Sequence, residues 1–394
     1  MSFKGAAAIT GIGESTFSRD SQKSVFTLAG EAVNAALADA GLTRKDIDGL
    51  LTVQEIAEGG SLNVAMAHYL GINPTYSDEV TVWGASNGYA VKQAAEAIAA
   101  GTAKNVLIVG ADLNLLSSDS IAAGKMQKSG FGMPMGEFES PLGPHAANTS
   151  YAMLATLHEH LYGTTEEMRA KVSVDQRFNA SKNPNSLFGS RPLSIEDVLN
   201  SPIVVSPLHI FEIVYPCDGA MAMIVSRADD AKAITKTPVY VEGAGFYADH
   251  LTMASAPAFR NGLVSPVKVS AEQAFKMAGI TPKDVDVLGI YDCYTIVVIM
   301  TLEDMGFCKK GEGGHFVQEH DLTFKGDLPV NTSGGQLSVG QPGDAGGMVN
   351  VIEVVRQLMG KAGERQIPDA EIGVTNSNGG LCMDTECTLV LRRG

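Results

Sequence analysis

The stretch AGLTRKDIDGL (residues 40–50) is repeated later in the chain as AGITPKDVDVL (residues 278–288), with seven of the eleven positions identical. An amphipathic helical pattern precedes each copy and a short apolar strand follows it. Each helix would end at Ala-Gly, since glycine readily adopts the left-handed C-cap. Thr43 and Thr281 are then possible N-caps of the next short turn. A chance match of two helix–turn–strand units is the alternative, but the flanking order also matches.

The segments around the two copies follow the same order. Each half opens with a strand, AAAITGIG (6–13) or PVYVEGAGFYA (238–248), and later has a Gly-rich loop that enters a helix. Such strand–helix alternation predicts an α/β fold made of two homologous halves. We expect residues 1–230, with an insert of loops and helices at 115–230, and residues 231–394. Loops at the carboxyl ends of the strands would share one site.

Composition restricts the classes of function. The chain has 394 residues, is 45% hydrophobic and 19% charged, and carries a net charge of −15. This charge disfavours nucleic acid and anionic membranes as partners, although local donors could still hold an anionic ligand. The N-terminal residues do not resemble a signal peptide, and no apolar run is long enough to predict a membrane span. Five scattered cysteines without a C-x-x-C pattern favour reduced thiols in the cytoplasm and predict no metal site.

The segment TVWGASNGYAV (residues 81–91) contains a G-x-S-x-G match at Gly84–Gly88, where an apolar strand would turn into a helix. This pattern is the nucleophile elbow of α/β-hydrolases. Asp292 and His315 or His320 would give the hydrolase order, but these histidines belong to a different motif. The other interpretation makes Ser86 a turn hydroxyl that caps the helix, with the N–H groups of Gly84 and Ala85 forming an oxyanion site.

Four long motifs, at residues 150–186, 191–226, 291–317 and 328–347, resemble the sterol-carrier-protein-type thiolases of the thiolase superfamily. The resemblance covers nearly the whole chain. It implies a five-layer α-β-α-β-α thiolase fold, a homodimer and an acyl-CoA thioester as substrate. Coenzyme A would then be part of the substrate, and no permanently bound cofactor is expected.

The residues that perform thiolase chemistry are replaced. Gly84 stands at the position of the nucleophilic Cys, and Gln341 replaces the His of the G-H-P motif. The H-D-C-F motif of the subfamily reads Tyr291-Asp292-Cys293-Tyr294. The chain thus resembles the nucleophile-lacking steroid side-chain aldolases of the thiolase-like lipid transfer protein branch. This resemblance implies retro-aldol or aldol chemistry in which tyrosines move protons, and a small DUF35 partner with an OB fold and often a zinc ribbon.

Three residues are the predicted catalytic groups. Tyr291 is the candidate acid–base group, although a tyrosine that only packs at a strand end is the alternative. Because a phenol in water ionises near pH 10, a tyrosine base needs local hydrogen-bond donors. Asp292 could orient a neighbour or a water, and Gln341 can donate a hydrogen bond to a thioester or enolate oxygen but cannot act as a base.

Further residues are expected to line the site. They are Ser377, Gly379 and Gly380 in the region where thiolases carry a second cysteine, and His145 in the insert. Tyr294 is interpreted as packing, and Cys293 and Cys382 as buried inert thiols that could also border the site. Two other functions remain open: a CoA-dependent Claisen-type thiolase or acyltransferase without the usual Cys, and a non-catalytic thioester-binding subunit of a complex.

Overall fold

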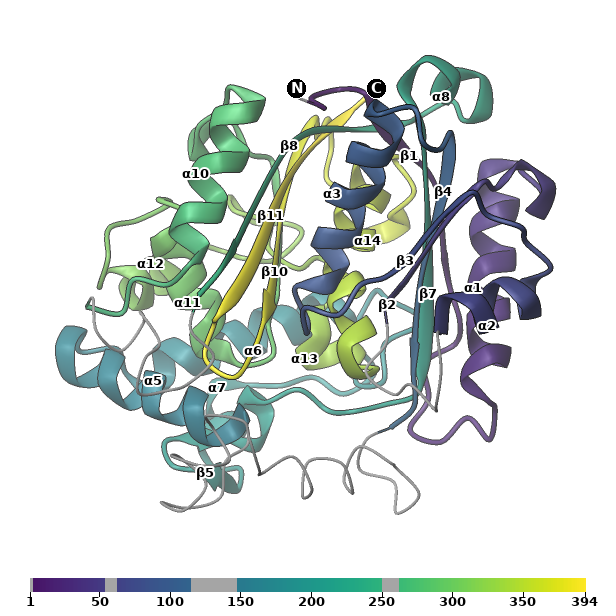
Figure 1. Cartoon of the computed structure of the whole chain (residues 1–394). Coiled ribbons are helices and arrows are strands. Elements are labelled where there is room, and N and C mark those ends of the chain that lie inside the picture. The colour runs from purple at the N-terminus through teal and green to yellow at the C-terminus, as the bar shows by residue number, and fades with distance from the viewer. Residues whose placement is uncertain (1–2, 54–61, 115–146, 250–261) are drawn as a thin grey trace, which may run out of the picture.

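A computed structural model describes residues 3–53, 62–114, 147–249 and 262–394 (Figure 1). Within these residues, nine strands form one mixed sheet in the order β3-β2-β4-β7-β1-β8-β11-β10-β9, and β5 and β6 form a separate pair. The strands are β1 (Ala7–Glu14), β2 (Gly49–Val53), β3 (Tyr76–Glu79), β4 (Asn105–Asp112), β5 (Ile203–Val205), β6 (Leu208–His209), β7 (Gly219–Arg227), β8 (Val239–Ala248), β9 (Val287–Ile290), β10 (Ile372–Gly379) and β11 (Thr385–Arg393).

The sheet repeats its own order. The run β2-β4-β7-β1 of the first half is mirrored by β9-β10-β11-β8 of the second, with only β3 added at one edge. In each run the first two strands are parallel and the other neighbours antiparallel. The two runs meet where β1 pairs with β8, through Ala8–Tyr240 and Ile9–Val239. The duplication in the sequence is therefore a duplication of the fold.

Helices connect and cover these strands. The α-helices are α1 (Val25–Ala40), α2 (Leu62–Leu70), α3 (Ser86–Ala99), α5 (Ala147–Tyr162), α6 (Glu166–Ala180), α7 (Ile195–Leu199), α8 (Ala228–Ile234), α10 (Val267–Ala278), α11 (Thr295–Asp304), α12 (Gly313–Glu319), α13 (Gly335–Val339) and α14 (Met348–Leu358). Short 3-10 turns are η1 (Arg44–Asp46), η4 (Ile210–Glu212), η5 (Pro282–Asp284), η6 (Gly343–Gly347) and η7 (Gly363–Arg365). As expected, α1 and α10 end at left-handed glycines, Gly41 and Gly279.

Five layers result from the way these helices pack. The central helices α3 and α14 lie between the two runs of strands (Figure 1), and one apolar cluster joins them to both. A second cluster packs α1 on the outer face of β2, β4 and β7. A third packs α10 and α11 on the outer face of β9, β10 and β11. The expected α-β-α-β-α arrangement is confirmed.

The repeated stretch makes the same hydrogen bonds in both halves. The Thr43 N–H and Oγ1 donate to Asp46 Oδ2 at 2.8 and 2.7 Å, and Thr281 donates in the same way to Asp284 Oδ2, both at 2.8 Å. Each Thr–Asp pair closes the short turn that enters β2 or β9, as a capping box does. The N-cap roles expected for the two threonines are confirmed.

A second aspartate in each copy anchors the neighbouring strand. Asp48 accepts from the N–H of Asn105 at 2.8 Å, where β4 begins. Asp286 accepts from the N–H of Ile372 at 2.9 Å, where β10 begins. The repeat thus fixes the register of the parallel strand pair in each half, which explains why its aspartates recur.

Two sequence expectations about elements are wrong. The predicted insert at 115–230 includes β7, which lies in the middle of the sheet between β4 and β1. Its residues are buried on both faces from Gly219 to Ser226, so no alternation marked it as a strand. The apolar run at 80–83 is not a strand either. The strand β3 ends at Glu79, and Thr52–Glu79 is the last residue pair between β2 and β3.

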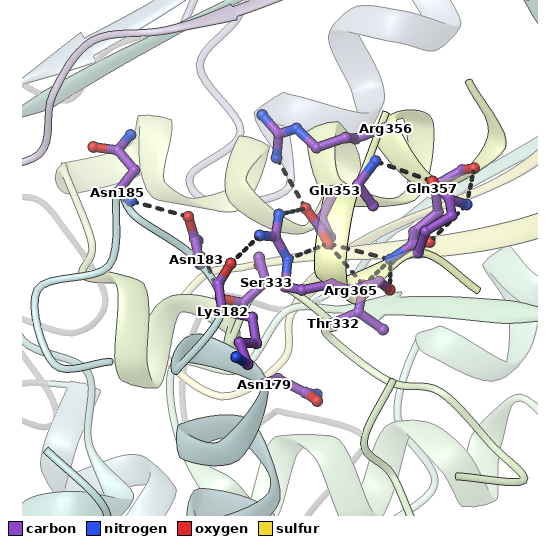
Figure 2. Close-up of polar contacts among 12 residues, drawn as sticks. Asn179, Lys182, Asn183, Asn185, Thr332, Ser333, Glu353, Arg356, Gln357 and Arg365 are labelled. Atoms are coloured by element: carbon purple, nitrogen blue, oxygen red, sulfur yellow. Dashed lines mark hydrogen bonds and ion pairs between the residues drawn. The ribbon is translucent and has the colours of Figure 1, made fainter. Parts of the chain in front are cut away.

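A buried ionic cluster joins three distant segments (Figure 2). Glu353 of α14 is 1% exposed and accepts from the Nε and Nη2 of Arg365 at 3.1 and 3.0 Å and from Arg356 at 2.9 Å. Arg365 also donates to the carbonyl of Lys182, after α6, and Arg356 to Glu14 of β1. We call these residues, Glu353, Arg356 and Arg365, the Glu353 clamp. Burial alone would raise the pKa of Glu353, but the two guanidinium groups hold this pKa below its ordinary value.

Candidate active site

Tyr291 lies against Gly84, although the two residues are far apart in sequence. A Cβ built on Gly84 would lie 2.4 Å from the Tyr291 hydroxyl oxygen and 2.4 Å from the Asn378 carbonyl oxygen. Tyr291 is 5% exposed, and its backbone N–H donates to the Asn376 carbonyl of β10. Its backbone is therefore held beside β10, and its ring is buried. The phenol therefore occupies the volume into which a side chain at position 84 would project. A cysteine at residue 84 would require both this ring and the Asn378 carbonyl to move.

The turn before α3 is held by hydroxyl groups. Trp83 has a left-handed φ of 55°, which is unusual for a bulky residue. The buried Ser86 Oγ accepts from the Val82 N–H at 2.8 Å, across the turn. Ser377 Oγ, on β10, accepts from the Gly88 N–H at 3.1 Å and so caps the first turn of α3 from another element. Ser86 is thus a turn hydroxyl as expected, but it closes the loop upstream and does not cap the helix.

A serine hydrolase triad is not assembled at this turn. His320 Nδ1 is bound to Asp327 at 2.5 Å, on a different loop. Asp292 accepts hydrogen bonds from the beginning of α13. The Ser86 hydroxyl accepts from Val82, so Ser86, Asp292 and His320 are each engaged in other contacts.

Gln341 is directed at the phenol of Tyr291. Its Nε2 donates to the Tyr291 hydroxyl oxygen at 3.0 Å. The loop that carries it is fixed by its own backbone: the Gln341 N–H donates to the Tyr215 carbonyl at 2.9 Å, and its carbonyl accepts from the Cys217 N–H at 3.0 Å. Gly340 has a φ of 116°, and a Cβ there would lie 2.8 Å from the Cys217 sulfur. Two of the three predicted catalytic residues therefore meet.

Asp292 contacts the beginning of α13, whereas the neighbouring Tyr291 contacts Gln341. Asp292 is fully buried, and its carboxylate accepts from the N–H groups of Gln336 and Leu337 at 2.9 and 3.1 Å and from Asn350 Nδ2 at 2.8 Å. Burial raises the pKa of Asp292 to about 6, against the opposing effect of these donors. Asp292 caps α13, whose last residue precedes Gly340. The geometry makes it a positioning residue for the loop of Gln341, and a role in proton transfer stays a prediction.

The loop after β10 closes the site beside the Gly84 turn. A Cβ on Gly379 would lie 2.5 Å from the Val82 carbonyl and 3.1 Å from the Ala85 nitrogen, so only glycine permits this approach. Gly380 has a φ of 86° and turns the chain toward Asp384. Ser377 and Gly379 thus border the turn, Gly380 follows them on the side of Asp384, and His145 lies outside the residues that the structure describes.

Tyr294 and the two thiols near the site, Cys293 and Cys382, are buried. Tyr294 stacks on Tyr151 with ring centroids 4.3 Å apart, and its hydroxyl donates to Asn148 at 2.5 Å. Cys293 is buried among these rings, and burial raises the pKa of its thiol well above the ordinary value. Cys382 is fully buried and lies 3.1 Å from an Asp384 oxygen. These positions agree with packing roles.

Asn87 is a residue of the site that the sequence did not reveal. Its Nδ2 donates to the Gly84 carbonyl at 2.9 Å and to the Asp344 carbonyl at 2.8 Å. It thereby ties the turn before α3 to η6, which leads into α14. An asparagine between the serine and the glycine of the motif was the available signal, but its second partner is 257 residues away.

Two family models match the sequence of this chain. Residues 6–205 match the thiolase N-terminal domain, and residues 245–393 match a thiolase C-terminal domain-like model. The chain belongs to the thiolase family. This thiolase-family protein also resembles a solved structure, the Ltp2-ChsH2(DUF35) aldolase, with a TM-score of 0.83 and 31% identity over 100% of this chain and 99% of the other.

Curated relatives of this thiolase-family protein include both lyases and transferases. The 17-hydroxy-3-oxo-4-pregnene-20-carboxyl-CoA lyase of Mycobacterium tuberculosis is 34% identical, over 90% of this chain and 92% of the relative. The steroid side-chain-cleaving aldolase of Thermomonospora curvata is 33% identical, over 89% and 90%. The acetyl-CoA acetyltransferase of Methanothermobacter thermautotrophicus is 33% identical, over 95% and 96%. The expected class, a thiolase-superfamily enzyme related to the aldolase branch, is confirmed. None of the described helices is long and apolar enough to cross a membrane.

Proposed function

We propose that the protein cleaves or forms a C–C bond of an acyl-CoA thioester by retro-aldol or aldol chemistry, without an acyl-enzyme. The observation that carries this proposal is the phenol of Tyr291 in the volume above Gly84. A covalent step would need a nucleophile at this position. A retro-aldol step needs a base and an oxyanion site, and the same volume holds a group that can exchange a proton.

The cleavage step balances with the groups present. Tyr291, as phenolate, removes the proton of the β-hydroxyl group, and the bond between Cα and Cβ breaks as the carbonyl of the leaving aldehyde or ketone forms. The electron pair passes to Cα and the thioester, giving an enolate. The Tyr291 phenol formed in this step then returns its proton to Cα, which regenerates the phenolate. Gln341 Nε2 donates to the Tyr291 oxygen, which favours the phenolate over the phenol.

The enolate oxygen requires donors at the turn before α3. The Ser86 N–H donates to the Trp83 carbonyl and the Gly88 N–H to Ser377. The N–H groups of Gly84 and Ala85 therefore remain the proposed oxyanion donors, at the positive end of the helix dipole. Coenzyme A enters as part of the substrate, and the proposal needs no permanently bound cofactor.

One similar solved structure supports a proposal for the assembly. The similar solved structure pairs a thiolase-like aldolase with a DUF35 protein. We propose that this chain works as a homodimer with a small DUF35 partner, in the cytoplasm.

The test uses the purified protein with its DUF35 partner and a β-hydroxyacyl-CoA, and measures release of aldehyde or ketone. Tyr291→Phe should lower kcat by about 100-fold or more, the contribution typical of a positioned acid–base group. Tyr294→Phe is the matched control: it removes a neighbouring buried hydroxyl and should leave turnover nearly unchanged. Normal turnover by Tyr291→Phe would remove Tyr291 from the mechanism. Cleavage that requires added free CoA would instead support the Claisen-type thiolase reaction.

A further inference from the structure

Two backbone carbonyls of β10 lie next to Tyr291 and the Gly84 turn. The Asn376 carbonyl accepts from the Tyr291 N–H at 3.1 Å. Two residues later, the Asn378 carbonyl oxygen lies 2.4 Å from the place where a Cβ of residue 84 would be. Both carbonyls therefore border the site, and a shift of this strand would move the phenol against the Gly84 turn.

The side chains of the same two asparagines are held on the face of β10 that is turned toward the outer helices. Asn376 Nδ2 donates to Glu386 Oε2 at 2.9 Å, and Asn378 Nδ2 donates to the Tyr151 hydroxyl at 3.0 Å. Glu386 lies on β11 directly opposite Asn378 in the antiparallel pair. Side chains in such opposite positions are within contact distance of each other. Asn376, Asn378 and Glu386 are all at most 2% exposed.

Three acceptor atoms of this cluster have no donor among the described residues. Asn376 Oδ1, Asn378 Oδ1 and Glu386 Oε1 are buried, and none of them has a hydrogen-bond partner among the described residues. All three atoms are acceptors if Glu386 is ionised. A buried acceptor without a donor is costly, and an unpaired buried carboxylate is more so. A proton on Glu386 Oε1 converts one of the three acceptors into a donor and removes the charge.

The charged groups around Glu386 also disfavour a carboxylate. Asp304 at the end of α11 and Asp384 before β11 are the titratable neighbours that act on it, and both are acidic. Lys310 is committed to Asp304 and Glu303, at 2.6 and 3.0 Å. Burial raises the pKa of Glu386 well above its ordinary value, and the single donor, Asn376, offsets this only in part.

We propose that Glu386 is a neutral carboxylic acid, that its Oε1 donates a hydrogen bond to the amide oxygen of Asn378, and that this bond positions β10 beside Gly84 and Tyr291. Glu386 is thus a positioning residue, since it acts through Asn378 and touches no reacting atom. The kinetic part of this inference rests on the proposed function, whereas the protonation state can be measured in the resting protein.

The protonation state is tested first, by infrared spectroscopy of the wild type and of Glu386→Gln at pH 7. The wild type should show the carbonyl band of a buried neutral carboxylic acid, and this band should be missing from Glu386→Gln. Glu353→Gln is the matched control, because Glu353 is equally buried but paired with two arginines, and the band should persist in it. Loss of a carboxylate band in Glu386→Gln, with the acid band unchanged, would overturn the proposal whether or not any substrate is turned over.

The pH dependence of unfolding is a second readout. A glutamate whose pKa is raised in the folded state stays protonated while the unfolded chain ionises, near pH 4.3. The free energy of unfolding of the wild type should therefore fall, relative to that of Glu386→Gln, as the pH rises above about 4. The side chain of Glu386 would instead be ionised if Glu386→Gln were less stable than the wild type at pH 7 and the stability difference did not change in this way with pH.

The positioning role is tested by comparing Glu386→Gln with Glu386→Leu. Glutamine can accept from Asn376 and donate to Asn378, so kcat should stay within about threefold of the wild type. Leucine leaves both amides without this partner, and kcat should fall by about tenfold or more. Loss of activity in a folded Glu386→Gln, failure of that variant to fold, or full activity of both variants would each overturn the positioning role. Inactivity of the wild type itself would contradict the proposed function instead.

Discussion

Two successive turns of α14 meet opposite surroundings. Asn350 donates to Asp292 and to the Ile290 carbonyl, on the side of the site, where the donors to Asp292 are amide N–H groups. Glu353, one turn later, meets the guanidinium groups of Arg356 and Arg365 (Figure 2). Both carboxyl groups are buried, yet the pKa of Asp292 is raised and that of Glu353 is lowered. The partner, more than the depth of burial, decides which carboxyl group is charged.

This contrast separates stability from chemistry. The Glu353 clamp uses full charges to join α14 to β1, to η7 and to the segment after α6. The site uses neutral donors, and burial there raises the pKa of Asp292 to about 6. We therefore expect substitutions in the clamp to lower stability with little effect on turnover, and substitutions in the site to do the reverse.

The largest effect is expected from Arg365→Met. This change leaves Glu353 buried with one of its two arginines and removes the link to the Lys182 carbonyl. Breaking a buried ion pair from one side typically costs about 3–5 kcal/mol of the free energy of unfolding. Urea denaturation measures this loss, and kcat of the folded protein at low temperature should be unchanged. Lys182→Met is the control: its ion pair with Glu364 is exposed, so no measurable loss of stability is expected.

Gly84→Ala should have the second-largest effect, now on the rate. The new Cβ would lie 2.4 Å from both the Tyr291 hydroxyl oxygen and a backbone carbonyl, so the phenol must move. A displaced acid–base group should lower kcat by about 100-fold. Overpacking should also cost roughly 1–3 kcal/mol of stability.

Two further variants make this test specific. Gly30→Ala is the control, because it adds the same methyl group within α1, where the nearest atoms belong to the half-exposed ring of Tyr69. The double variant Gly84→Ala/Tyr291→Ala removes the ring but leaves the Asn378 carbonyl, so its loss of stability should be smaller than the sum of the losses in Gly84→Ala and Tyr291→Ala, without recovery of activity. Additive losses of stability in this cycle would show that the two residues do not compete for this volume.

Much of the fold could be predicted because local chemistry recurs in the sequence. The Thr43–Asp46 and Thr281–Asp284 turns lie within the repeated stretch, so their capping and the strands that follow could be identified directly. The strand β7 could not be identified, because it is buried on both faces and its Ala- and Met-rich run does not alternate between apolar and polar residues. Likewise, β3 is a polar edge strand that lacks the apolar signal of the residues after it.

The site was predictable only in part. Tyr291 and Gln341 were identified from the motifs in which they replace histidines, and the structure brings them within hydrogen-bond distance. The competition of Tyr291 with a side chain at residue 84 depends on the pairing of β9 with β10, which no local pattern encodes. Glu386 was missed for a similar reason: its burial and its neighbours Asn376 and Asn378 follow from the register of β10 and β11.

The smallest effect is expected from Gln341→Leu, which tests whether a neutral donor tunes the phenol. Loss of one hydrogen bond to Tyr291 should lower kcat/KM by about tenfold at neutral pH. If Tyr291 acts as a phenolate, kcat/KM rises with pH as the phenol ionises. Removing the donor disfavours the phenolate, so this rise should move to higher pH and activity should recover in alkaline solution. A uniform decrease at every pH would mean that Gln341 acts on the substrate, and the comparison with the clamp would then have to rest on Asp292 alone.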